Sequence, residues 1–140
     1  MYVLDSNIVI YYFRDRGRVV SNFLRASSST LLLPSVVLYE LQTGIKKAGS
    51  PRRRVAELNN FLDKVRVIDF DCDAADAASA VRTLLEARGT PIGPIDTLVA
   101  GVALSRDATL VTHNVREFCA DTGLKNCRLV LSGIATLSIF

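Results

Sequence analysis

The sequence predicts one α/β domain over residues 1–140, with a central parallel sheet of four to five strands and helices on both faces. Short apolar runs alternate along the chain with longer segments of helical periodicity. These runs are too apolar to leave one face in water, which is typical of parallel strands that are covered on both sides. A length of 140 residues, 49% of them hydrophobic and 22% charged, suits a single globular domain.

The predicted strands are short runs that end at polar or turn-forming residues. The first ends at Asp5, and Pro34 stops the second. The third alternates in the way a strand does, whereas the fourth is of the fully buried type. The predicted strands are residues 1–4, 30–33, 65–70, 109–112 and 128–131.

The predicted helices follow these strands and carry recognisable start and stop signals. Asp5 to Asn7, Ser35 and Asp73 stand where helices begin, while Gly49 and Gly89 stand where helices end. Between these signals, apolar residues recur at spacings of three and four. The predicted helices are residues 8–13, 19–26, 36–47, 52–64, 74–88 and 95–104, with a turn or short helix at 113–120.

Composition favours a cytoplasmic protein without a membrane segment. No apolar run approaches the ~18 residues that span a bilayer, and the N-terminus lacks the basic segment of a secretory signal. The three cysteines, Cys72, Cys119 and Cys127, contain no CxxC pair, so we expect reduced thiols that are mostly packed as small hydrophobes.

The net charge of +3 does not by itself indicate nucleic-acid binding, but the cations are unevenly distributed. No acidic residue lies between Glu40 and Glu57, and this segment is rich in lysine and arginine. A solvated surface and a phosphate-binding patch both explain the run. Its basic residues are Lys46, Lys47, Arg52, Arg53 and Arg54.

Acidic residues follow the predicted strands where α/β proteins bind their ligands, at the carboxyl ends. Asp5 follows the first strand, Glu40 lies one to two turns into the next helix, and Asp96 opens a later helix. Asp5 could simply cap a helix, and Asp96 could favour a helix dipole. Glu40 is harder to explain, because its neighbours Val36 to Leu41 are almost wholly apolar.

Acids that meet in one crevice repel each other unless a cation joins them. Mg²⁺ and Mn²⁺ prefer such hard oxygen ligands, and either ion could activate water for phosphodiester hydrolysis. The pattern therefore favours a metal-dependent nuclease without a covalent nucleophile. His113 could serve as a base, or it could simply be a solvated loop residue.

In these residues and their spacing the chain resembles the PIN-domain family, and specifically the VapC-type toxins of bacterial type II toxin–antitoxin systems. The similarity spans nearly the whole chain, and its motifs occur in the order and at the spacing of the family. They are residues 2–7 (YVLDSN), 34–41 (PSVVLYEL) followed by Gly44, 91–96 (PIGPID) leading to Gly101, and 110–118 (LVTHNVREF).

The resemblance implies a Mg²⁺- or Mn²⁺-dependent endoribonuclease that inhibits translation and is held inactive by a cognate antitoxin. It also implies a homodimer, and a heterotetramer or larger assembly with the antitoxin. Asp5, Glu40 and Asp96 match the acids that bind metal in the family. The fourth acidic position departs from the family pattern, because Asn114 stands there and Glu117 follows one helical turn later.

The resemblance favours the basic run as a surface that contacts RNA, and the Thr112 hydroxyl could make a further RNA contact. The hydroxyls of Thr112 and Ser6 could equally orient a water molecule or form a local hydrogen bond that caps the backbone. Single-stranded or structured RNA is the expected substrate, with tRNA a candidate class. Nothing in the sequence identifies the RNA target.

Three other functions compete with this one. A haloacid-dehalogenase-like phosphatase would place a second aspartate where Asn7 stands. A response-regulator receiver would need an acidic pair at the first strand and a lysine after a late strand, and the sequence has neither. The remaining alternative is a catalytically weak PIN-like module that binds RNA or protein. Retention of three buried acids argues against that module, since a binder would gain by replacing them with apolar groups.

Overall fold

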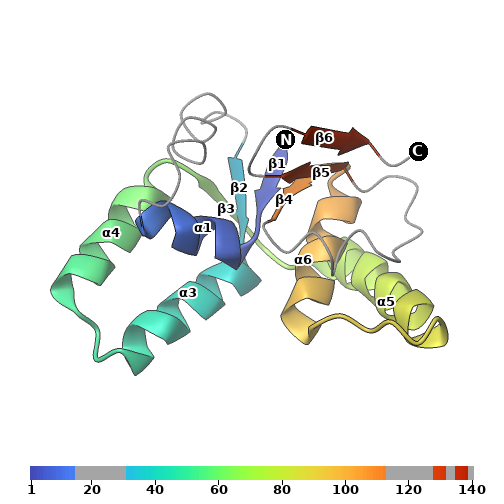
Figure 1. Cartoon of the computed structure of the whole chain (residues 1–140), viewed down its shortest axis with the longest axis horizontal. Coiled ribbons are helices and arrows are strands. Elements are labelled where there is room, and N and C mark those ends of the chain that lie inside the picture. The colour runs from blue at the N-terminus through green and yellow to red at the C-terminus, as the bar shows by residue number, and fades with distance from the viewer. Residues whose placement is uncertain (15–30, 113–127, 132–134, 139–140) are drawn as a thin grey trace.

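A single sheet runs through the computed structural model, which describes residues 1–14, 31–112, 128–131 and 135–138 (Figure 1). The strand order is β3-β2-β1-β4-β5-β6. β1 to β5 pair in parallel, whereas β6 pairs with β5 in the antiparallel sense. The strands are β1 (Tyr2–Leu4), β2 (Leu31–Pro34), β3 (Arg66–Ile68), β4 (Thr109–Val111), β5 (Arg128–Leu131) and β6 (Ala135–Ser138).

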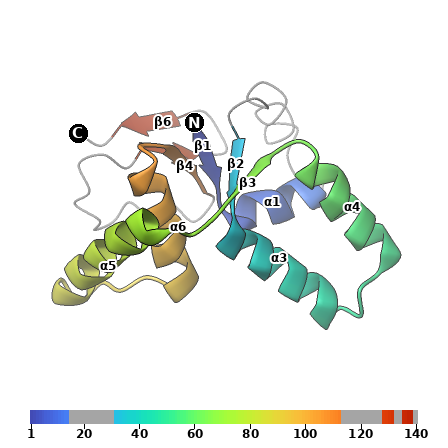
Figure 2. The ribbon, with the colours of Figure 1, turned by 180° about the vertical axis from the view of Figure 1, so that it is seen from behind.

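The helices form two groups on the two sides of the strands, as the two opposite views in Figures 1 and 2 show. One group contains α1, α3 and α4, and the other contains α5 and α6. This arrangement follows from right-handed crossovers, since the chain first builds outward from β1 to β3 and then returns to β4. The helices are α1 (Ser6–Phe13), α3 (Ser35–Lys47), α4 (Arg52–Leu62), α5 (Cys72–Ala87) and α6 (Pro94–Ser105).

The predicted fold class is confirmed, and five of the predicted helices begin and end within two residues of the observed bounds. The antiparallel strand β6 was not predicted. β3 is shorter than the predicted strand 65–70, and the expectation that no strand has a wet face is wrong for it. Its Val67 is 40% exposed, because β3 lies at the edge of the sheet.

Two local predictions of helix caps are wrong. The helix α5 is capped by Asp71 and not by Asp73, because the Asp71 carboxylate accepts a hydrogen bond of 3.0 Å from the Ala74 N–H. Ser35 is the first residue of α3, and its hydroxyl accepts the N–H of Phe70. Cys72 is exposed at the start of α5, whereas Cys119 and Cys127 lie outside the described residues, so the packing expected for most of the cysteines stays a prediction.

The α5–α6 pair is close-packed through small residues. A Cβ added at Gly101 of α6 would lie 2.5 Å from the carbonyl oxygen of Ala74 and 2.6 Å from the Cβ of Ala78. Such distances leave no room for a side chain. This contact fixes α6 against α5, and α6 also contacts β1 and β4.

The register brings the carboxyl ends of the central strands to one edge of the sheet. Leu4 of β1 pairs with Val111 of β4, and Val3 pairs with Leu32 of β2. The chain leaves β1 at Asp5, whose N–H donates to the Val111 carbonyl at 3.1 Å. This edge therefore holds the residues that were predicted to carry the chemistry.

Some predictions fall outside the described residues, namely the helix 19–26 and the turn or short helix 113–120. Among the described helices, none combines the length and the apolar character needed to cross a lipid bilayer.

Candidate active site at the carboxyl edge of the sheet

Asp5 is a buried carboxylate at the end of the central strand β1. It is 1% exposed, and its Oδ2 accepts a hydrogen bond of 2.7 Å from the hydroxyl of Thr112, which is itself fully buried. Ser6 donates to Oδ1 at 3.3 Å, and the Asn7 amide donates to Oδ2 at 3.5 Å. Donors from two adjacent strand ends thus hold one carboxylate in place.

The simplest structural explanation for Asp5, a side chain that caps helix α1, does not describe the observed geometry. Asp5 occupies the N-cap position with extended backbone angles, but its side chain makes no hydrogen bond to the backbone of α1. Burying a carboxylate costs free energy that hydrogen bonds or a cation must offset. The observed hydrogen bonds hold the side chain beside the strand ends, and it takes no part in capping α1.

Asp96 lies in the first turn of α6, and its carboxylate folds back over Gly93. A Cβ at Gly93 would lie 2.6 Å from Oδ2 of Asp96. The backbone of Gly93 is extended, with φ −56° and ψ 148°, so any residue could adopt this conformation. Glycine at this position therefore leaves space for the Asp96 carboxylate, and the backbone conformation does not require it.

Glu40 is half-buried on α3 and lines a hollow of about 160 Å³ between α1, α3 and α4. Its lining contains several apolar side chains together with two arginines, Arg14 and Arg54. The buried face of α3 is formed by Val37 and Leu41. Glu40 is therefore partly open to solvent, and Asp96 is half-buried as well, so the expectation of three buried acids is wrong for these two and right only for Asp5.

The five predicted basic contacts lie in different surroundings. Lys46, Lys47 and Arg52 are exposed at the end of α3 and the start of α4. Arg53 is 87% exposed and pairs with Glu57 at 2.8 Å. Arg54 lines the hollow that contains Glu40. Sequence reasoning noted the run, but it did not separate these three situations.

The described residues contain no group of three or more His, Cys, Asp or Glu side chains placed to hold a metal ion together. The donor chemistry still fits Mg²⁺ or Mn²⁺, since Asp5, Glu40 and Asp96 offer only hard oxygen ligands. Mg²⁺ in particular is commonly held by one or two carboxylates, with water and substrate phosphate completing the shell. A site built on Asp5 therefore does not require three converging acids.

Asn114 and Glu117, the candidates for the fourth acidic position, lie outside the described residues, as does His113. Sequence reasoning missed Arg14 and Gly93 as parts of this region. Arg14 carried a usable signal, because it directly follows the helix that Asp5 begins. Gly93 had none, since its role depends on where the Asp96 carboxylate points.

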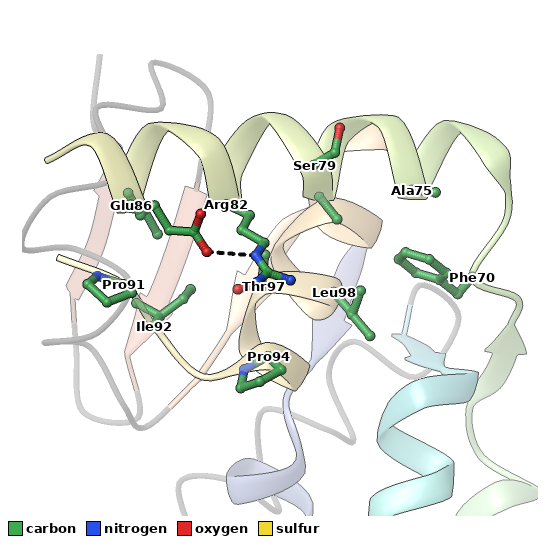
Figure 3. A pocket seen from close by; sticks show the side chains of 12 residues that line it. Phe70, Ala75, Ser79, Arg82, Glu86, Pro91, Ile92, Pro94, Thr97 and Leu98 are labelled. Atoms are coloured by element: carbon green, nitrogen blue, oxygen red, sulfur yellow. Dashed lines mark hydrogen bonds and ion pairs between the residues drawn. The ribbon is translucent and has the colours of Figure 1, made fainter. Parts of the chain in front are cut away.

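A second hollow, of about 490 Å³, lies on the other side of the sheet between α5 and the segment that leads into α6 (Figure 3). Its lining is mainly apolar, with Phe70, Ile92 and Leu98 among the residues that form it. Arg82 and Glu86 form an ion pair of 2.7 Å at this hollow. It contains none of the three candidate acids, so we do not assign the chemistry to it.

A parallel sheet with a buried aspartate after its central strand, and further acids on the helices beside it, defines an α/β protein with a candidate phosphodiesterase site. The model of the PIN domain matches residues 2–120, and the chain belongs to the PIN-domain family.

Curated relatives are similar over most of their length. The chain is 32% identical to the tRNA(fMet)-specific endonuclease VapC of Salmonella typhimurium over 124 residues. This match covers 89% of this chain and 94% of the relative. The chain is 36% identical over 120 residues to ribonuclease VapC2 of Rickettsia felis, covering 84% and 90%.

Solved structures of similar proteins from the same two organisms have the same fold as this chain. VapBC2 of Rickettsia felis bound to a promoter DNA fragment aligns with a TM-score of 0.84 at 32% identity, covering 93% of this chain and 97% of that one. DNA-bound VapBC of Salmonella typhimurium aligns with a TM-score of 0.85 at 30% identity, covering 94% and 97%.

Proposed function

We propose that the chain is a Mg²⁺- or Mn²⁺-dependent endoribonuclease and the toxin of a toxin–antitoxin pair. The observation that carries the proposal is the Asp5 carboxylate, which is 1% exposed at the end of β1 and is not used to cap α1. The relatives named VapC ribonucleases support the same activity over nearly the whole chain. We propose a cytoplasmic location for the protein.

In this proposal Asp5 binds the metal ion directly, Glu40 and Asp96 bind it directly or through its water ligands, since the described residues hold no three-acid group, and Asn114 or Glu117 completes the acidic set. When bound, the ion supplies the Lewis acidity that makes water a competent nucleophile at neutral pH. Thr112 and Ser6 orient Asp5 through the hydrogen bonds described above. Because Thr112 is fully buried, we assign it to positioning Asp5 and not to direct contact with RNA.

The substrate in this proposal is single-stranded or structured RNA, with tRNA the first class to test, since one relative is named for tRNA(fMet). Cleavage of such RNA inhibits translation. The partner is a cognate antitoxin, in keeping with the VapBC complexes among the similar structures. We further propose a homodimer that joins the antitoxin in a heterotetramer or a larger assembly.

Cleavage of purified total tRNA tests the activity. The wild-type chain should cut it with Mn²⁺ and should stop when EDTA is added. Asp5→Asn should lower the rate by about a hundredfold or more, yet it should leave thermal stability intact because the asparagine oxygen can still accept the Thr112 hydroxyl. The matched control is Asp76→Asn, which removes an exposed carboxylate on α5. Equal rates in the two variants would reject Asp5 as a catalytic residue.

The alternative of a catalytically weak module that binds RNA or protein rests on a specific finding, the lack of a three-acid group among the described residues. Thermal unfolding with and without millimolar Mn²⁺ separates the two functions. A working site should show a rise in the unfolding temperature that Asp5→Asn and Asp96→Asn abolish. RNA binding without a Mn²⁺-dependent rise and without cleavage would favour the module. Sequencing of RNA 5′ ends after brief expression, beside Asp5→Ala, would identify the target.

A further inference from the structure

Two arginines from different helices face the same hollow beside Glu40. A hollow of about 240 Å³ is lined by Arg14, Arg53 and Arg54, and it shares Arg14 and Arg54 with the hollow of about 160 Å³ that contains Glu40. The two hollows also share the apolar residues Ile10 and Phe13. The two hollows are therefore adjacent, and together they form what we call the arginine groove, with Glu40 in the lining of one of them.

The charges along this groove do not cancel, because Arg14, Arg53 and Arg54 face only two carboxylates, those of Glu40 and Glu57. Glu57 lines both hollows, but its carboxylate is already paired with Arg53 at 2.8 Å. Within the described part of the chain, the side chains of Arg14 and Arg54 make no ion pair or hydrogen bond. Two guanidinium groups beside one groove repel each other, and a bound anion would relieve that repulsion.

The groove has the chemistry of a site for a nucleic-acid strand. The guanidinium group matches the geometry of a phosphate and can bind it through two hydrogen bonds. The apolar side chains of Ile10, Phe13, Leu41 and Ile45 in its lining offer a surface for a ribose or base. Glu40 in the same lining connects the groove to the proposed catalytic acids.

We propose that Arg14 and Arg54 form a subsite for a backbone phosphate of the RNA strand, outside the scissile bond. The inference deepens the proposed function and rests on it for the identity of the strand. It also divides the predicted basic run, because Arg54 belongs to the subsite whereas Arg53 serves mainly to neutralise Glu57. Arg14 lies outside that run and belongs to the subsite together with Arg54.

Binding of a fluorescein-labelled oligouridylate in EDTA, where no cleavage occurs, tests the subsite. Arg14→Ala and Arg54→Ala should each weaken binding by roughly three- to tenfold. The double variant should lower the slope of log affinity against log salt by about 0.7, the value for one lost phosphate contact on a single strand. Arg54→Lys should retain part of the affinity, because the charge remains while the paired hydrogen bonds are lost.

The matched control is Arg82→Ala, since Arg82 is an exposed arginine on α5 that pairs with a glutamate four residues away, as Arg53 does. The stabilisation by Mn²⁺ should not fall in any of these variants, because the subsite does not hold the ion and the loss of a nearby positive charge disfavours no cation. Affinities and salt slopes equal to those of the control would overturn the proposal. Unchanged RNA binding with lost co-purification of a co-expressed antitoxin would also overturn it, and would assign the groove to the protein partner.

The subsite and the proposed function can fail separately. If the wild-type chain binds the oligouridylate through Arg14 and Arg54 but never cuts RNA with Mn²⁺, the proposed function fails and the subsite stands. If it cuts tRNA and both arginine variants bind as tightly as the wild type, only the subsite fails.

Discussion

The α5–α6 pair and the group of α1, α3 and α4 cover opposite sides of the same sheet, but their helices pack differently (Figures 1 and 2). α5 and α6 meet through small residues, with Gly101 directly against the backbone of α5. α1 and α4 meet through rings, where Tyr12 and Phe13 pack on Phe61 with centroids 5.6 and 5.7 Å apart.

The hollows beside the two groups of helices also differ, in the residues that line them. The α5–α6 side encloses a mainly apolar hollow that contains no candidate acid. The other side leaves a groove lined by arginines that reaches Glu40. Close packing against α5 fixes α6, the helix that carries Asp96, whereas the sparser contacts among α1, α3 and α4 leave a charged surface open to ligands. Substitutions at the helix contacts and at the strand ends between the two groups test this contrast.

The largest expected effect comes from filling the α5–α6 contact. Gly101→Leu should destabilise the fold by about 3 kcal/mol, because the new side chain meets the Ala74 carbonyl and Ala78. Gly44→Ala on α3 is the matched control, since a Cβ there meets nothing within 4 Å, and it should stabilise by up to about 1 kcal/mol. Urea unfolding measures both. Similar midpoints for the two variants would contradict the contrast.

A smaller effect is expected at the strand ends between the two groups. Thr112→Val removes the hydroxyl that donates to Asp5 and leaves a buried carboxylate one donor short. The free energy of unfolding should fall by about 1–3 kcal/mol. Thr112→Ser, which restores the hydroxyl, should recover most of the cleavage rate. If valine and serine gave equal rates, Thr112 would not position Asp5.

Gly93→Ala should separate the site from the fold. The added methyl group occupies the space of the Asp96 carboxylate, which is the far end of a flexible side chain and has to shift to make room. We expect affinity for Mn²⁺ to fall by roughly tenfold with little change in unfolding temperature. Mn²⁺ titration by thermal shift measures both quantities. A large loss of stability with unchanged Mn²⁺ affinity would show that Gly93 serves the backbone instead.

The smallest effect concerns pH. Asp71 at the start of α5 has a pKa below its ordinary value of 3.8, because the Ala74 N–H and then Arg106 favour its charged form. A lowered pKa in the folded state stabilises the fold above the pKa of the unfolded chain, and this contribution is lost as pH falls below about 3.8. Asp71→Ala should therefore be less stable than the wild type at pH 7. The difference should shrink in acid, as urea midpoints at several pH values would show.

Much of the fold could be predicted because its signals are local. The apolar runs and the glycine and proline stops place the helices α1, α3, α4, α5 and α6 within two residues. The antiparallel strand β6 could not be derived in this way, because its direction depends on a pairing between strands. Asp71 replaced Asp73 as the cap because two aspartates two residues apart give the same signal.

The candidate site was only partly predictable. The rule that ligands bind at strand ends selected Asp5, and the structure places that residue in the buried position between β1 and β4. The pairing of Arg53 with Glu57 follows from a spacing of four residues on a helix. The groove that joins Arg14 to Arg54 depends on the angle between two helices, and no local pattern encodes such an angle.

The hydrogen bond from the Asp5 amide to the Val111 carbonyl has a consequence for how the protein opens. Amides between central strands exchange with solvent deuterium only in the rarest, most extensive opening events. The backbone that carries this acid therefore belongs to the last part of the molecule to come apart. Fraying of the surrounding helices would change access to the acid well before it displaced the acid itself.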